Sequence, residues 1–127
     1  MSTLIINNKF LHIQKVTDYD VKNNYYSCMS VLPRKTIEIF TILSSIEIEE
    51  KLKDQRIFII EDVNSKQMVG SASVSFLNNT STIAKIAYIE DIIIKHNYES
   101  KELREELINY LINVCVNGDN CVKCIIK

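Results

Sequence analysis

The chain has 127 residues, of which 46% are hydrophobic, and its 15 basic and 16 acidic side chains give a net charge of -1. A chain of this size predicts one domain, residues 1–127, with one continuous core. The near balance of charge excludes a general electrostatic surface for nucleic acid or for an acidic membrane.

The N-terminal residues 1–16 lack a basic region followed by a long apolar run, as a secretory signal would require. No segment reaches the roughly 18 consecutive apolar residues that a membrane-spanning helix needs. We therefore expect a cytoplasmic protein without membrane contact. In such a compartment thiols stay reduced, and this applies to Cys28, Cys115, Cys121 and Cys124.

The first half of the chain predicts one strand followed by helices. Residues 10–16 alternate between apolar and polar side chains, as a half-buried strand does. Thr17 and Asp18 offer N-caps for an amphipathic helix that runs to about Leu32, just before a proline. Residues 37–54 are apolar at mixed spacing, which predicts one or two short helices.

The second half predicts strands around one helix. Residues 56–62 and 67–76 are apolar runs that a four-residue polar turn joins into a hairpin. The next turn leads into residues 85–95, the longest predicted strand. A helix over 101–116 and a strand over 121–127 complete the chain.

These elements predict an α+β (α/β) domain with a mixed central sheet and helices on both faces. Their order is β-α-α-β-β-β-α-β, in which an antiparallel meander leads into a strand-helix-strand unit. The last two strands must be parallel, because a helix crosses over between them.

Two segments carry a resemblance to a known family. Residues 58–74, FIIEDVNSKQMVGSASV, and residues 89–108, IEDIIIKHNYESKELREELI, are similar to matching segments of the GNAT superfamily of acetyl-CoA-dependent N-acetyltransferases. The resemblance extends from about Phe10 to the end of the chain and is greatest to the glucosamine-6-phosphate N-acetyltransferases. The matching positions are Ile89, Glu90, Asp91, Tyr98, Leu103 and Leu107.

The resemblance implies a site for acetyl-CoA. In the family, the strand that matches residues 85–95 separates from its neighbour, and its backbone binds the pantetheine arm. This implies backbone contacts at Ile92, Ile93 and Ile94. The loop and helix start that follow would face the pyrophosphate, because free amides at a helix N-terminus favour an anion. These residues are Glu99, Ser100, Lys101, Glu102, Leu103 and Arg104.

Three positions of this loop depart from the family pattern. Glu99 stands where the family has a basic or amide residue, and Glu102 and Arg104 replace the two glycines. The two carboxylates satisfy the helix dipole themselves and repel a pyrophosphate over a few Å. One alternative is that Lys101 or Arg104 turns toward the phosphates as a substitute cation. Another is an ordinary helix with Ser100 as its N-cap, which needs no ligand.

Glu90 and Asp91 are the candidate catalytic residues. Adjacent residues of a strand face opposite sides, so the two carboxylates cannot form a paired acid/base site. One of them is expected at the cleft, where it would accept a hydrogen bond from a substrate amine or hydroxyl. The alternative role is a polar group at the strand separation or at a dimer edge. His96 follows the long strand near the expected ligand, but a lone loop histidine is more often solvated.

The sequence predicts no metal site. Cys121 and Cys124 have the CxxC spacing. They fall in the predicted strand 121–127, where residues three apart face opposite sides and cannot share a metal without a bend.

The last predicted strand also suggests a partner. In the family a further helix and strand follow it and supply part of the acceptor site, including a tyrosine suited to protonate the departing thiolate; here the sequence stops at Lys127. An uncovered strand over 121–127 would form a sheet edge, which a second copy of the chain can cover. We therefore expect a homodimer.

Two hypotheses about function remain open, and the sequence leaves undecided whether the chain is an enzyme. In the first, a degenerate member of the fold has lost or weakened acetyl-CoA binding and acts as a homodimeric binding or assembly module. In the second, an active N-acetyltransferase transfers acetyl from acetyl-CoA to a small amine such as glucosamine 6-phosphate. The altered loop and the absent tail favour the first hypothesis.

Overall fold

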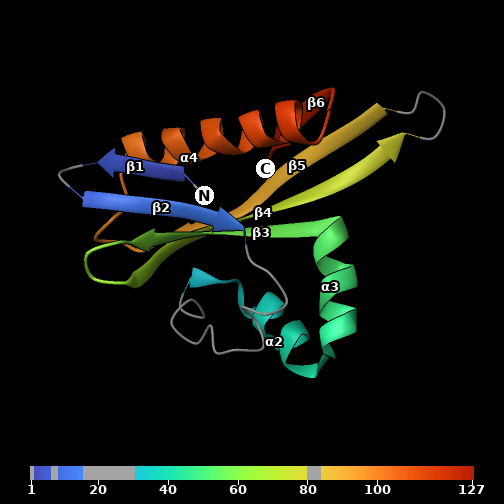
Figure 1. Cartoon of the computed structure of the whole chain (residues 1–127), viewed down its shortest axis with the longest axis horizontal. Helices are drawn as coiled ribbons and strands as arrows, with labels where there is room; N and C mark the ends of the chain where they lie inside the picture. The colour runs from blue at the N-terminus through green and yellow to red at the C-terminus, as the bar shows by residue number, and fades with distance from the viewer. Residues whose placement is uncertain (1, 7–8, 16–30, 80–83) are drawn as a thin grey trace.

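The computed structural model describes residues 2–6, 9–15, 31–79 and 84–127, which form a six-stranded sheet with helices on both faces (Figure 1). The strands lie side by side in the order of the sequence. They are β1 Ser2–Ile6, β2 Lys9–Lys15, β3 Gln55–Asp62, β4 Gln67–Asn79, β5 Ala84–Ile94 and β6 Lys123–Ile126. The helices are α2 Arg34–Ile42, α3 Ser45–Asp54 and α4 Lys101–Asn113, which continues into the π-helical turn η2 Val114–Gly118.

The mixed α+β sheet predicted from the sequence is confirmed. All neighbouring strands are antiparallel except β5 and β6, which are parallel as the crossover helix requires. Strand β1 corrects the predicted order, in which the first strand begins at residue 10. Its short run STLII is too brief for a clear alternation, and it becomes a strand by pairing with β2.

The predicted helical region 37–54 is divided into α2 and α3. The break follows from a capping box at the start of α3, where the Ser44 side chain accepts from the Glu47 amide and the Glu47 carboxylate accepts from the Ser44 amide. The helix predicted from Thr17 or Asp18 falls mainly on residues 16–30, outside the described residues.

Strand β3 is buried on both faces, which explains its unbroken apolar run. Phe58 and Ile60 face α4, whereas Ile57 and Ile59 face α2 and α3. This division follows from the twofold alternation of a strand. The sheet therefore lies between two apolar clusters.

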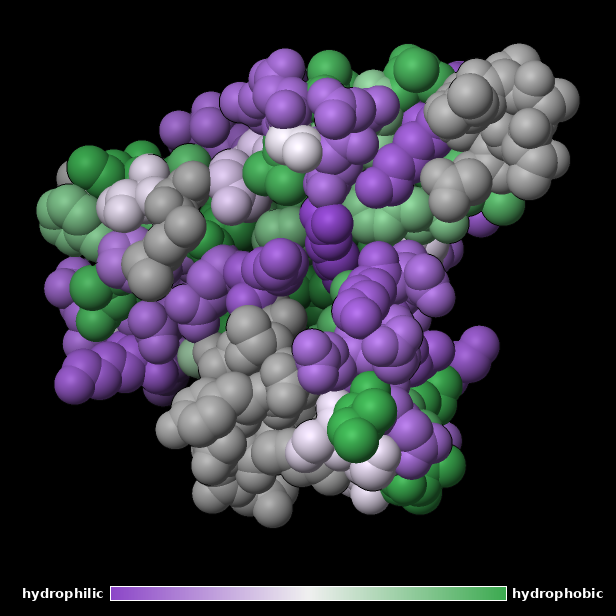
Figure 2. Space-filling model, turned by 45° about the vertical axis from the view of Figure 1, so that its right-hand side comes forward, coloured by the Kyte–Doolittle hydropathy of each residue, from purple (hydrophilic) through white to green (hydrophobic). Residues whose placement is uncertain are grey.

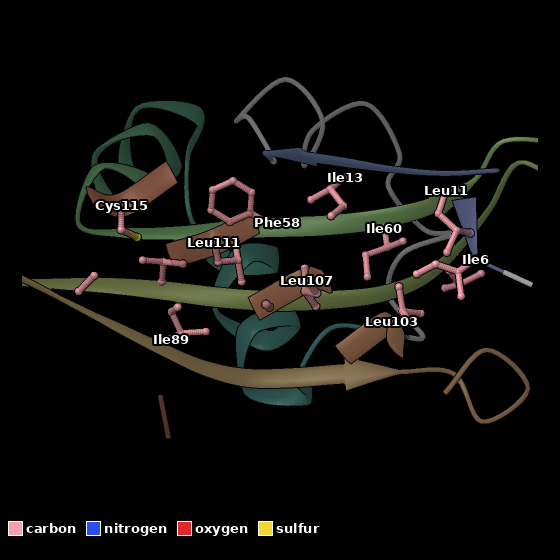
Figure 3. Close-up of a cluster of buried hydrophobic side chains, with 14 of the residues drawn as sticks. Ile6, Leu11, Ile13, Phe58, Ile60, Ile89, Leu103, Leu107, Leu111 and Cys115 are labelled. Carbon is pink, nitrogen blue, oxygen red and sulfur yellow. The ribbon is translucent and has the colours of Figure 1, made fainter. Parts of the chain in front are cut away.

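Helix α4 packs the larger cluster against the sheet (Figure 3). Leu103, Leu107 and Leu111 repeat every four residues and are each buried. They lie on one face of the helix, opposite Ile60 and Ile89 of the sheet. Each buried leucine contributes about 1.5–3 kcal/mol of hydrophobic stabilisation. This packing fixes where α4 begins, next to the end of β5.

Candidate functional site

A β-bulge interrupts β5 at the predicted catalytic pair. Glu90 is paired with Ser73 of β4 and Ile93 with Ser71, so two residues of β5 lie opposite Ala72 alone. Asp91, the first of these two residues, has a φ of 55°. Aspartate is among the few side chains that tolerate this left-handed conformation.

The bulge gives Glu90 and Asp91 different surroundings. The Glu90 side chain is partly buried and accepts a hydrogen bond of 3.0 Å from the Ser75 hydroxyl. Asp91 is exposed. The structure therefore does not bring the two carboxylates together, and Glu90 is the one held in place by a neighbour.

Beyond the bulge, β5 leaves one backbone edge open. β6 pairs with Ile86–Ile89 only, and the last bond runs from the Lys127 amide to the Ile89 carbonyl at 2.8 Å. Within the described residues no strand pairs with β5 on that side past Ile89. The Lys95 amide donates to the Val69 carbonyl of β4. Because successive residues of a strand direct their backbone groups to opposite sides, the amide and carbonyl of Ile94 point toward the open edge. Such groups can bind an extended amide chain.

The loop from β5 to α4 engages several of its own amides. The amides of Tyr98 and Glu99 both donate to the Lys95 carbonyl, at 2.9 and 3.0 Å. Ser100 is the N-cap of α4, and its hydroxyl accepts from the Leu103 amide at 3.0 Å. Three donors that could face an anion are therefore already engaged.

The charged groups of this loop also pair with one another. Arg104 holds Glu99 through two hydrogen bonds, of 3.0 and 3.2 Å. Lys101 lies 3.9 Å from Glu105, and both side chains are strongly exposed. The two parallel bonds hold the Arg104 guanidinium on the Glu99 carboxylate. A guanidinium binds a phosphate through the same two-pronged geometry, so Arg104 would have to leave Glu99 in order to bind one.

A network that is not among the sequence predictions anchors the same loop. Tyr98 donates a 2.6 Å hydrogen bond to Asp62, which is only 5% exposed at the end of β3. This bond lowers the pKa of Asp62 and raises that of Tyr98. The ammonium of Lys9 lies 4.0 Å from the centre of the Tyr98 ring.

Only part of this network could be read from the sequence. The carboxylate of Asp62 also accepts from the Asn64 amide at 3.1 Å, as expected for an aspartate that opens a turn. Its bond to Tyr98 joins residues 36 positions apart, and no local pattern reports it.

The remaining candidates are dispersed. His96 is exposed in the loop, and His12 lies within β2, where it is paired with Thr3 of β1 and Glu61 of β3. Cys121 precedes β6, so the strand alternation expected for the CxxC pair does not apply to it. No group of three potential metal ligands is found among the described residues. No helix in the described ranges is long and apolar enough to cross a membrane.

Two groups of exposed hydrophobic side chains lie on other elements than this loop. Figure 2 shows hydrophobic side chains at several places on a mixed face, among them a group at its lower end, where α2 and α3 lie. Ile42 and Ile46 of these helices are 80% and 74% exposed. A second exposed apolar group, Val122 and Ile126, lies at β6.

Comparison with models of protein families and with curated proteins finds no match. Solved structures do match. Glucosamine-6-phosphate N-acetyltransferase from Arabidopsis thaliana has a TM-score of 0.66 and 22% identity, covering 92% of this chain and 81% of its own. Ribosomal-protein-alanine N-acetyltransferase from Brucella melitensis biovar Abortus 2308 has a TM-score of 0.65 and 13% identity, with coverage of 92% and 79%. A predicted acetyltransferase with acetyl-CoA from Clostridium acetobutylicum has a TM-score of 0.60 and 14% identity, with coverage of 92% and 80%.

These likenesses show that the chain has the GNAT acetyltransferase fold, as the sequence predicted. At such identities they show the fold alone, and a fold does not determine an activity.

Proposed function

We propose that this chain is a GNAT-fold binding module in which acetyl-CoA binding is lost or weakened, and that it acts as a homodimer. The charged side chains at the start of α4 carry the proposal. A pyrophosphate bound there would have to displace the pairing of Glu99 with Arg104 and approach the exposed carboxylate of Glu102. Each like-charge pair at about 4 Å costs roughly 1 kcal/mol in water and about 4 kcal/mol near a protein surface.

Calorimetric titration of the full chain with acetyl-CoA tests the loss of cofactor binding. The proposal expects no heat of binding at millimolar ligand. Binding at micromolar strength would overturn it. The double variant Glu99→Gln/Glu102→Gln removes both carboxylates, and we expect its affinity for acetyl-CoA to rise at least about tenfold.

Glu106→Gln is the matched control for the single variant Glu102→Gln, which should give part of that gain. It removes one carboxylate from the exposed side of the same helix, one turn further from the loop. An equal gain in affinity from this control would assign the effect to net charge. An unchanged affinity in the double variant would show that loop charge is not what blocks the site.

The outer edge of β6 supports the homodimer. Val122 and Ile126 are 69% and 48% exposed there, and β6 has a paired strand on one side only within the described residues. Light scattering across a concentration series should show a dimer, and Ile126→Lys should shift it to monomer. Ile46→Lys, on α3, is the control that should leave the dimer intact. A monomer at all concentrations contradicts this part of the proposal.

Glu90 favours a second function, N-acetyl transfer to a small amine. Its carboxylate lies at the bulge, next to the open edge of β5, where it would accept a proton from an amine acceptor. The Ser75 hydroxyl would hold that carboxylate in position. Thiol release from acetyl-CoA with glucosamine 6-phosphate and other small amines tests this function. If the natural chain releases thiol and Glu90→Gln does not, the chain is an N-acetyltransferase and the binding-module proposal fails.

A further inference from the structure

Three cysteines meet where α4 ends and β6 begins. Cys115 lies in η2, Cys121 precedes β6, and Cys124 lies within β6. The amide of Cys121 donates to the carbonyl of Cys115 at 3.0 Å. Cys115 and Cys121 belong to the apolar cluster beneath α4, and Cys124 packs against it. Figure 3 shows the Cys115 side chain at the end of this cluster.

Cys115 and Cys124 lie on neighbouring elements of this junction, because η2 contacts β6. The Cys124 thiol is near enough to add to the rise in the pKa of Cys115. Each cysteine comes from an element that tertiary contacts hold in place, because Leu111 anchors the end of α4 and β6 is paired with β5. Close approach of two thiols from separate elements is the geometric requirement for a disulfide.

The two thiols differ in their access to solvent. Cys124 is partly exposed, whereas Cys115 is 1% exposed. Burial raises the pKa of Cys115 to about 12, with the neighbouring Cys124 and Cys121 adding to the effect. A buried, protonated thiol is inert toward oxidants in solution. An oxidant therefore meets Cys124 first, and Cys115 is placed to react with the product.

We propose that Cys115 and Cys124 form a reversible disulfide when the protein meets a peroxide. The Cys124 sulfur attacks the peroxide, gains one oxygen to become a sulfenic acid, and releases water from hydrogen peroxide. The Cys115 sulfur then attacks the Cys124 sulfur, the S–S bond forms, and the hydroxyl leaves with the thiol proton as a second water. Together the two sulfurs lose two electrons, and the peroxide gains the same two electrons.

The crosslink joins the end of α4 to β6 and closes a loop over residues 115–124. It restricts the unfolded chain, so the oxidised protein is expected to melt at a higher temperature than the reduced one. This inference does not depend on acetyl-CoA binding, because no residue of the loop before α4 takes part. If these cysteines act only as small apolar side chains in the core, no disulfide is expected between Cys115 and Cys124.

Peptide mapping of the full natural chain after treatment with hydrogen peroxide tests the proposal. Cleavage after Arg104 and Lys123 gives the peptides 105–123 and 124–127, and the second contains Cys124 alone. The oxidised sample should contain these two peptides joined, about 2 Da lighter than their sum, and dithiothreitol should separate them. Fragmentation between Cys115 and Cys121 identifies the linked residue. Unlinked peptides, or a link to Cys121, would overturn the proposal.

Two serine variants give a second measurement that avoids the most buried thiol. Cys124→Ser should abolish the link and the rise in melting temperature. Cys121→Ser is the matched control, and it should keep both. If the melting temperature of Cys124→Ser still rises on oxidation, the Cys115–Cys124 pair is not the redox site.

Discussion

The two ends of α4 are held by different kinds of contact. At its start, the contacts are local: Ser100 caps Leu103, and Glu99 pairs with Arg104 five residues later. At its end they are distant in sequence, because Arg56 of β3 bonds Asp119 at 2.6 Å across 63 positions. The ion pair at the first end is solvated, and the one at the second end is largely buried. The local contacts set the arrangement of charges in the loop, and the distant ones attach the end of the helix to the sheet.

Removal of the Asp119 carboxylate should give the largest effect. Arg56 and Asp119 are 23% and 12% exposed, so Asp119→Ala leaves a guanidinium with little access to water. We expect the free energy of unfolding to fall by about 3 kcal/mol. Urea unfolding measures it. Glu38→Ala breaks the exposed pair of Arg34 and Glu38 and should cost about 0.3–0.5 kcal/mol. Equal losses in both variants would erase the contrast between the buried and the exposed pair.

The Tyr98 hydroxyl is the exception at the first end, because it makes a long-range bond. Tyr98→Phe leaves the buried Asp62 with its turn amides only and should cost about 2 kcal/mol near neutral pH. Chemical unfolding of both proteins at one pH measures the difference. If the free energy of unfolding falls by less than it does when the exposed pair of Arg34 and Glu38 is broken, the bond of Tyr98 contributes no more than the local contacts do.

The pH dependence of that difference follows from the two pKa shifts. The pKa of Asp62 is lowered in the folded state, so its contribution is present above the unfolded value of about 3.8 and is lost as pH falls through the lower folded value. The pKa of Tyr98 is raised, so its contribution is present below about 10.0 and is lost as pH rises through the higher folded value. The difference between wild type and Tyr98→Phe should therefore be greatest between about pH 4 and pH 10. A difference that stays constant below pH 3 contradicts the assignment to Asp62.

Loss of the N-cap should have a smaller effect. Ser100→Ala removes the acceptor of the Leu103 amide and should lower the free energy of unfolding by about 1 kcal/mol. Ser100→Thr keeps an acceptor and should recover most of the loss. Equal losses in both variants would show that the hydroxyl does not act as a cap.

The same contrast explains what the sequence could predict. The N-cap at Ser100 and the buried stripe of α4 follow from residue type and spacing, and both are found. β1 was missed because its five residues become a strand through pairing with β2. The bulge at Asp91 was also beyond sequence analysis, because it depends on the count of residues in β4 opposite β5. Contacts such as Arg56 with Asp119 require the fold before they can be named.

The pairing of Glu99 with Arg104 should contribute least to stability, although our proposal gives it the main part in keeping a phosphate from the loop. The two side chains are 37% and 41% exposed, so water screens their attraction. A double-mutant cycle with Glu99→Gln and Arg104→Gln should give a coupling energy of about 0.5 kcal/mol or less. In the same cycle, Glu99→Gln releases Arg104 from its carboxylate, so the affinity for inorganic pyrophosphate should rise in that single variant and fall again in the double variant. A coupling above about 2 kcal/mol would mean that the pair holds the loop closed as part of the fold. Rebuilding a phosphate site there would then require a change of the loop backbone as well as of its charges.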